Sequence, residues 1–282
     1  MIQCQNVYKS FNRKTVINGI NLEISDGQIF GLLGPSGAGK TTLIKILTDQ
    51  LSYDSGSVNI LNKSVEKLTG EDKKKIGIMM VQFGVYDRLS CFDNLKIYAD
   101  IYGISYSKAK EMLEYVGLGE AINKPASNLS KGMGARLRLA RVFMHSPEII
   151  FLDEPTSGLD PRSMKAIHKI ILDKKKEGCT IFLTTHNMEE AATLCDTIAL
   201  LNDGVIVDQG EPKEICRKYN NKKKIILHLL NGEDIQLPHG SESAERICEL
   251  LKANEIATIH SSEPTLETVF LELTGRKLQE EE

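Results

Sequence analysis

The chain has 282 residues, of which 35 are lysine or arginine and 38 are aspartate or glutamate, so its formal net charge is −3. This balance predicts no nucleic-acid partner, and a hydrophobic content of 41% is ordinary for a globular protein. No apolar run approaches the ~18 residues that cross a bilayer, and the N-terminus lacks the apolar core of a signal peptide. We therefore expect a cytoplasmic protein.

Residues 16–33, VINGINLEISDGQIFGLL, first alternate between apolar and polar side chains and then become mostly apolar. The pair Asp26-Gly27 predicts a turn between two strands, the second of which covers residues 29–33. The spacing of apolar residues at 43–47 predicts a helix. A glycine-rich loop therefore connects a strand to a helix.

This loop, GPSGAGKT at residues 34–41, fits the pattern of a phosphate-binding P-loop. Its glycines let backbone N–H groups turn toward the phosphates of a nucleotide, and the Lys40 ammonium adds positive charge there. The Thr41 hydroxyl is placed to bind Mg²⁺. An ordinary glycine-rich turn is the alternative, although it would not require this spacing. The candidate ATP-binding residues are Gly34, Pro35, Ser36, Gly37, Ala38, Gly39, Lys40, Thr41 and Thr42.

Two carboxylates follow the apolar run IIFL at residues 149–152, which is typical of a central parallel strand. We expect Asp153 to hold Mg²⁺ through water. Glu154 is expected to point the other way at the strand end, where it could accept a proton from an attacking water or orient it. A structural ion pair is the alternative reading of the two carboxylates.

The rest of the chain divides into regions of different pattern. Residues 87–145 are predicted to be mainly helical, while strands and helices alternate after residue 149, which indicates a mostly parallel α/β sheet. From about residue 222 the pattern changes to a hairpin, a helix, a strand and a final helix. We predict a main domain of residues 1–220 and a small α+β appendage of residues 221–282.

These motifs, in this order, resemble those of the ATP-binding subunit of an ATP-binding-cassette (ABC) transporter over roughly residues 1–220. The resemblance implies the ABC-ATPase form of the P-loop NTPase fold, which has a mostly parallel sheet core, an antiparallel N-terminal β subdomain and a helical insert, here at about 87–145. It also implies that the chain hydrolyses ATP with Mg²⁺.

The resemblance assigns further roles around the chain's own nucleotide. Gln82 matches the Q-loop glutamine, which contacts Mg²⁺ and the attacking water and couples to the membrane subunit. His186 matches the switch histidine that contacts the γ-phosphate. Phe11 lies where the family places an aromatic ring against adenine, and Tyr8 is the competing candidate.

Other matching residues are expected to act on the nucleotide of a second copy. Ser130 and Gly132 belong to the signature loop, and Asp160 to the D-loop. The signature departs from the family's common form, because Lys131 and Met133 stand where glycine and glutamine are usual. Met133 cannot make the polar contact of a glutamine, so the ribose contact is in doubt, whereas the phosphate contacts of Ser130 and Gly132 are retained.

The sequence PTLETVFLELTGRKL at residues 264–278 resembles the tail of ATPases that serve ABC-2-type exporters. A plain packing stripe of Leu266, Val269, Phe270 and Leu273 is the other reading, and the two are compatible.

We therefore predict an ATPase subunit that pairs with a second copy of itself or with a paralogue. It would work with a polytopic membrane permease subunit, on the cytoplasmic face of the membrane, to export a substrate. An importer ATPase and a soluble ABC ATPase of translation, DNA repair or iron–sulfur assembly are alternatives. A regulatory nucleotide switch without turnover is a third, although Glu154 and His186 argue against it.

Overall fold

A six-stranded sheet forms the centre of the computed structural model, which describes residues 1–80, 84–220, 224–261 and 264–275. Its strand order is β10-β9-β3-β8-β7-β6, and all neighbours are parallel except β10 and β9. The strands are β3 (Ile29–Leu33), β6 (Ile76–Met79), β7 (Ile149–Asp153), β8 (Thr180–Thr185), β9 (Thr197–Asn202) and β10 (Val205–Gly210). The order places the P-loop strand β3 next to β8, and β8 next to the carboxylate strand β7.

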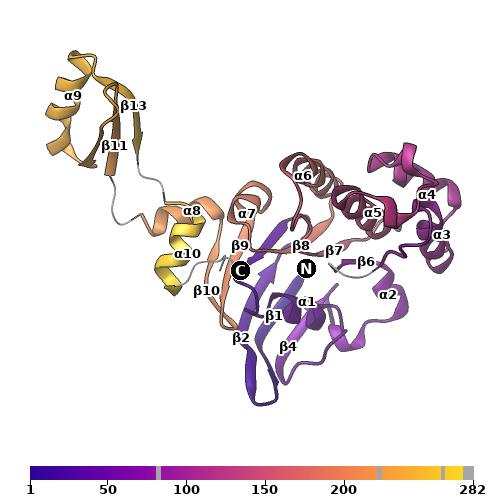
Figure 1. Cartoon of the computed structure of the whole chain (residues 1–282). Helices are drawn as coiled ribbons and strands as arrows, with labels where there is room; N and C mark the ends of the chain where they lie inside the picture. Colours follow the sequence, from indigo (N-terminus) through magenta and orange to yellow (C-terminus); the bar gives the residue numbers. More distant parts are fainter. Residues whose placement is uncertain (81–83, 221–223, 262–263, 276–282) are drawn as a thin grey trace.

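A second, antiparallel sheet lies in the N-terminal part of the chain, in the order β2-β1-β4-β5. Its strands are β1 (Ile2–Phe11), β2 (Lys14–Ile24), β4 (Ser55–Ile60) and β5 (Lys63–Ser64). Figure 1 shows β1, β2 and β4 together with α1 (Lys40–Leu47) on one side of the central sheet. The helices α5 (Lys131–Phe143), α6 (Pro161–Lys176) and α7 (Met188–Leu194) lie on the other side.

Helices cover the opposite face and build the predicted insert. Three of them, α3, α4 and α5, fall within residues 87–145 and pack on one another. The remaining bounds are α2 (Gly70–Lys74), α3 (Cys91–Tyr102), α4 (Tyr106–Tyr115) and α8 (Pro212–Lys218). Short 3₁₀ turns are η1 (Val65–Lys67), η2 (Gly119–Ala121), η3 (Ala126–Asn128) and η4 (Ser241–Ser243).

The central strands bury both of their faces, since successive side chains of a strand point in opposite directions. Leu33, Leu152 and Leu183 belong to the core under the helices. Phe151 and Phe182 point into the core shared with the antiparallel sheet. Both cores therefore fix the register of β3, β7 and β8, whose ends carry the candidate site.

The C-terminal residues form a separate small sheet and one helix that returns to the main domain. The sheet, in the order β12-β11-β13, packs on α9 around Leu227, Leu229 and Leu250. Its elements are β11 (Lys224–Leu229), β12 (Asp234–Pro238), α9 (Ala244–Lys252) and β13 (Ile256–Ser261), followed by α10 (Leu266–Thr274). The sheet and α9 stand away from the main domain, whereas α10 lies beside α8 (Figure 1). The division into residues 1–220 and 221–282 remains a prediction.

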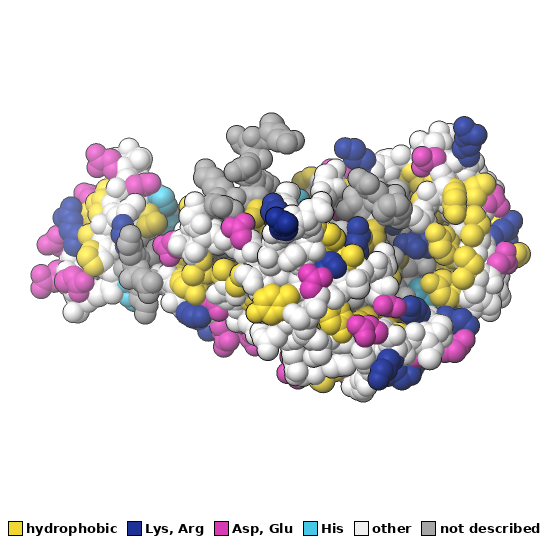
Figure 2. Space-filling view, turned by 90° about the horizontal axis from the view of Figure 1, so that it is seen from below, with side chains coloured by type: hydrophobic (Ala, Val, Ile, Leu, Met, Phe, Trp, Pro, Cys, Tyr) yellow, Lys and Arg dark blue, Asp and Glu magenta, His cyan; other side chains and the backbone are white. Residues whose placement is uncertain are grey.

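The predicted packing stripe of the last helix is buried. Leu266, Val269 and Phe270 of α10 join the same core as the helices of the main domain. Acidic side chains gather at the outer end of the appendage instead (Figure 2), where residues 224–261 hold six aspartates and glutamates against three lysines and arginines. The appendage thus has an acidic outer end, and α10 joins the hydrophobic core of the main domain.

Candidate functional site

The P-loop joins the end of β3 to the beginning of α1. Gly39 caps α1 with a left-handed φ of 111°, and a Cβ added there would lie 2.8 Å from the carbonyl oxygen of Val16, so only glycine fits. The first N–H groups of α1 have no partners within the helix, and the helix dipole makes this end positive. The loop is therefore built to receive an anion.

A cavity of about 530 Å³ opens beside this loop. Its lining combines the P-loop with both carboxylates: Val16, Pro35, Ser36, Gly37, Gly39, Lys40, Thr41, Thr42, Lys45, Met80, Asp153 and Glu154. A cavity of this size is typical of a site for a small ligand. The structure therefore brings together the P-loop and the two strand-end carboxylates, as the sequence predicts.

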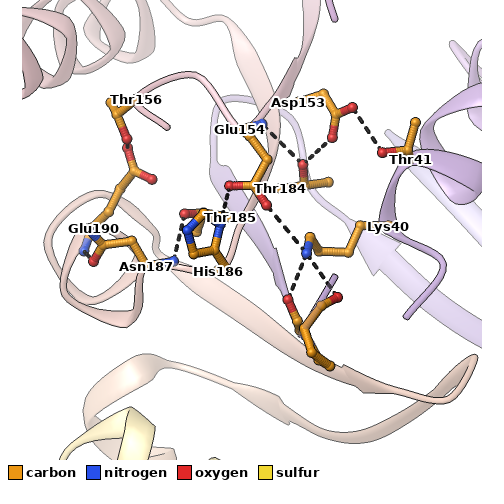
Figure 3. Close-up of polar contacts among 12 residues, drawn as sticks. Lys40, Thr41, Asp153, Glu154, Thr156, Thr184, Thr185, His186, Asn187 and Glu190 are labelled. Carbon is orange, nitrogen blue, oxygen red and sulfur yellow. Dashed lines mark hydrogen bonds and ion pairs between the residues drawn. The ribbon is translucent and has the colours of Figure 1, made fainter. Parts of the chain in front are cut away.

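Asp153 lies at the end of β7 and is buried, with both carboxylate oxygens hydrogen-bonded. Oδ2 accepts a hydrogen bond from the Thr41 hydroxyl at 2.9 Å, and Oδ1 accepts one from the Thr184 hydroxyl at 2.6 Å. Thr184, on the neighbouring strand β8, has no motif of its own in the sequence. These contacts fix the direction in which the Asp153 oxygens face the P-loop (Figure 3).

Glu154 lines the same cavity as Asp153, which corrects the expectation that the two side chains point opposite ways. The reason is the backbone: Glu154 has a left-handed φ of 48°, so the alternation of the strand ends before it. Its Oε1 lies 3.3 Å from Lys40 Nζ and its Oε2 lies 2.7 Å from His186 Nδ1. Lys40 also donates to the Gly34 carbonyl at 2.6 Å.

The two partners of Glu154 decide its ionisation. Burial alone would raise the pKa of Glu154, but the hydrogen bond with His186 and the charge of Lys40 outweigh it, and the pKa lies below its ordinary value. The same hydrogen bond raises the pKa of His186, against the effect of burial. The arrangement therefore favours an ionised glutamate beside a protonated histidine.

Ser130, Gly132 and Asp160 lie at the N-terminal ends of α5 and α6 and do not line this cavity. The Ser130 hydroxyl accepts a hydrogen bond from the Met133 N–H, and Asp160 accepts one each from the N–H groups of Arg162 and Ser163. The two helix ends touch, because a Cβ added at Gly132 would lie 2.3 Å from the Ser163 hydroxyl oxygen.

The remaining predicted residues are placed as follows. Gln82 lies outside the described residues. Phe11, 42% exposed at the end of β1, and Tyr8 are not among the described residues that line the cavity, whereas Val16 of β2 is. Met133 packs against the core under the helices, which gives this departure from the common signature a structural role. Lys131 is exposed, and nothing in the structure explains it.

A second polar cluster lies near the cavity but does not line it (Figure 3), and the sequence analysis does not predict it. Glu190 of α7 is 1% exposed, and its Oε1 accepts a hydrogen bond from the Thr156 hydroxyl at 2.6 Å. The same oxygen lies 3.1 Å from Nε2 of His168 on α6. These three residues come from separate segments, so their contact could be found only from the folded structure.

Comparisons with known proteins agree with this geometry. Residues 17–157, which include the P-loop and both carboxylates, match the family model described as ABC transporter. The chain is 31% identical to the linearmycin resistance ATP-binding protein LnrL of Bacillus subtilis (strain 168), over 99% of this chain and 100% of LnrL. It is 35% identical to the fluoroquinolones export ATP-binding protein Rv2688c of Mycobacterium tuberculosis (strain ATCC 25618 / H37Rv), over 93% and 88% of the two chains.

Two further matches are a relative named for import and a solved structure. The methionine import ATP-binding protein MetN of Clostridioides difficile (strain 630) is 34% identical over 86% of this chain and 77% of MetN. A dimeric structure of the ATP-binding cassette MJ0796 in a post-hydrolysis state, bound to ADP and Pi, is 25% identical. It superimposes with a TM-score of 0.68 over 75% of this chain and 98% of that one. The fold class predicted from the sequence is therefore confirmed.

Proposed function

Because the chain belongs to the ABC transporter family, as an ATP-binding subunit with ATPase activity, we propose that two copies hydrolyse ATP together and drive export through a separate membrane subunit. One observation carries this proposal. Lys40, Asp153 and Glu154 line a single cavity, whereas Ser130 and Asp160 lie outside it on exposed helix ends. Each copy would then bind one ATP and complete the site of the other.

Within one copy, the P-loop and the start of α1 bind the phosphates, with Lys40 beside them. The oxygens of Thr41 and Asp153, 2.9 Å apart, fit a hard cation such as Mg²⁺. Thr41 would hold Mg²⁺ directly, Asp153 through water, and Gln82 is the third proposed ligand. Bound there, the ion would supply positive charge to the β- and γ-phosphates.

Glu154 and His186 complete this half of the site. The lowered pKa of Glu154 keeps its carboxylate ionised, so it can accept a hydrogen bond from the attacking water and orient it. The raised pKa of His186 favours its protonated form, which can donate to the γ-phosphate. Catalysis would rest on positioning and charge without a covalent intermediate.

The second copy would supply Ser130 and Gly132 at the N-terminus of α5, a helix of 13 residues. Backbone N–H groups and the dipole at this end favour an anion such as the γ-phosphate. Asp160 caps α6 next to it and would lie at the seam between the copies. The similarity to a dimeric ATP-binding cassette supports this pairing.

The membrane subunit is inferred from the family to which the chain belongs. No helix in the described parts of the chain is long and apolar enough to span a bilayer. A separate permease would then hold the chain at the cytoplasmic face of the membrane. Export is favoured by the similarity to Rv2688c, while the similarity to MetN keeps import as the second candidate. Co-purification with a tagged chain tests for a polytopic partner, and transport assays with that partner decide the direction.

The catalytic proposal is tested by Glu154→Gln, which keeps the size of the side chain but removes its charge. We expect turnover to fall by roughly 10²–10⁴-fold while ATP affinity is retained, because the phosphate-binding loop is intact. With ATP, the variant should then accumulate as a dimer, which light scattering can detect. Hydrolysis by this variant at the wild-type rate would show that Glu154 does not have the proposed role.

A further inference from the structure

Glu190 is a carboxylate inside the protein, close to the proposed site but outside its cavity. It is 1% exposed, and among the described residues its Oε2 has no hydrogen-bond partner. Its Oε1 carries both contacts, with Thr156 at 2.6 Å and His168 at 3.1 Å. A buried carboxylate with a bare oxygen is costly, so a packing role alone does not account for it.

The packing of this region does not need the carboxylate. Ile167 of α6 and Ala191 and Leu194 of α7 are already buried in the same core. An apolar side chain at position 190 would extend that core without the cost of removing a charge from water. What Glu190 adds is a pair of hydrogen bonds in defined directions. Its carboxylate binds Thr156 and its backbone N–H binds Asn187, so it joins the two segments to which these residues belong.

The first of these segments is the turn between Glu154, at the cavity, and Asp160, at the start of α6. Thr156 follows Glu154 by two residues and precedes Asp160 by four, and it is only 3% exposed. Its hydroxyl is therefore a fixed point in the turn that leads from the cavity to the end of α6. The hydrogen bond to Glu190 holds this point from the side of α7 (Figure 3).

The second segment carries His186. Asn187 caps α7 by accepting a hydrogen bond from the Glu190 N–H at 3.0 Å, and the Asn187 N–H donates to the Thr185 hydroxyl at 3.0 Å. The backbone from 185 to 190 is thus held by successive short-range bonds. A shift of Glu190 would be passed to His186, whose Nδ1 lies 2.7 Å from Glu154.

We propose that Glu190 is a positioning residue that fixes His186 relative to the turn at residues 155–160 through its hydrogen bond with Thr156. The link joins the residue that contacts this chain's own nucleotide to the segment that reaches the partner's nucleotide, and in this respect the inference rests on the proposed function. His168 of α6 contacts the same carboxylate oxygen of Glu190 and adds a third segment to the cluster.

The test compares Thr156→Val, which keeps the shape but removes the hydroxyl, with Thr156→Ser, which keeps the hydroxyl. For the full-length chain we expect Thr156→Val to lower kcat about tenfold with KM for ATP nearly unchanged, because a displaced catalytic group slows the chemical step. Thr156→Ser should stay within about twofold of the wild-type kcat. Thermal unfolding of each variant serves as the control that its folded fraction equals that of the wild type.

Glu190→Leu provides a second route, since it removes the link while filling the space. The double variant with Thr156→Val should have a kcat no lower than that of the more impaired single variant, because both substitutions break the same Thr156–Glu190 hydrogen bond. An unchanged kcat in Thr156→Val, an equal loss in Thr156→Ser, or multiplied losses in the double variant would overturn the inference. Glu154→Gln assayed alongside separates the two proposals: if it abolishes turnover while Thr156→Val matches the wild type, only the positioning role fails.

Discussion

Around the P-loop, Lys40 is 7% exposed and Asp153 is 4% exposed, and both contact neighbouring groups of the same chain. On the ends of α5 and α6, Ser130 and Asp160 are exposed. Their oxygens accept hydrogen bonds from N–H groups of their own helices. The P-loop half of the proposed site is therefore held in place by its own chain, whereas Ser130 and Asp160 of the proposed signature half lie exposed at helix ends.

This difference has a physical consequence for how the two halves can work. Buried charges in contact are already desolvated and oriented, which is the condition for electrostatic stabilisation of a transition state. Exposed helix ends are hydrated and become strong anion sites only when water is excluded. A second copy closing over the nucleotide would provide that exclusion, so the two halves should fail in different ways when they are mutated.

The largest expected effect in the signature half comes from Ser130→Asp. Aspartate caps a helix as well as serine does, so the stability of α5 should be retained. Its carboxylate would stand where the partner's γ-phosphate is proposed to bind, and like charges repel. We expect ATP binding to the monomer to be unchanged and ATP-driven dimerisation, measured by light scattering in the Glu154→Gln background, to be lost.

The matched control is Ser130→Asn, which also caps the helix but carries no charge. It should retain dimerisation to a large extent. Equal dimerisation of the aspartate and asparagine variants would mean that no phosphate approaches Ser130, and the contrast between the two halves would then lose its functional meaning.

A smaller expected effect is on the pH dependence of thermal stability, which should differ between a substitution in the P-loop half and one in the signature half. The pKa of His186 is raised by its bond to Glu154, so its stabilising contribution is complete below the ordinary histidine pKa and is lost as the pH rises through the raised value. The pKa of Glu154 is lowered, so its contribution is lost only as the pH falls through that lower value. The bond is therefore strongest between these two limits.

We accordingly expect the melting temperature of His186→Ala to lie below that of the wild type by about 1–3 °C at pH 6, with a smaller difference at pH 9. Asp160→Asn serves as the control from the other half. Its native carboxylate has a lowered pKa, chiefly because of the hydrogen bond from Ser163, and stays ionised across this range. The melting-temperature difference for this control should not change from pH 6 to 9, and a His186→Ala difference that is equally constant would contradict the pair.

How much of this could be predicted depends on how local each feature is. Lys40, Thr41 and Asp153 were predicted from a loop and a strand end whose geometry is set by a few adjacent residues. The structure places all three around one cavity, while their roles stay predictions. The predicted direction of the Glu154 side chain was wrong, because the rule of alternation assumes that the strand continues. The φ of 48° at Glu154 ends the strand there. The hairpin, helix and strand at 224–261 were also predicted, because each has its own apolar period.

Other features depend on contacts between distant segments. Thr184 reaches Asp153 across 31 residues, and Glu190 reaches Thr156 across 34. A single sequence gives no register between β7 and β8 and no direction for α7, so these partners could not be named. The apolar stripe of α10 predicted burial, but that it would pack beside α7 and α8 instead of within the appendage is a property of the fold.

The most direct test of the shared site is to mix two inactive variants. Lys40→Ala should lose ATP binding in its own P-loop, and Ser130→Asp should spoil the site of its partner. In a mixed pair, both defects fall on one site, and the other combines an intact P-loop with an intact signature end. We predict that an equimolar mixture regains up to about a quarter of the wild-type turnover, since half of random pairs are mixed and each has one intact site of two. Turnover no higher than that of the separate variants would contradict the account.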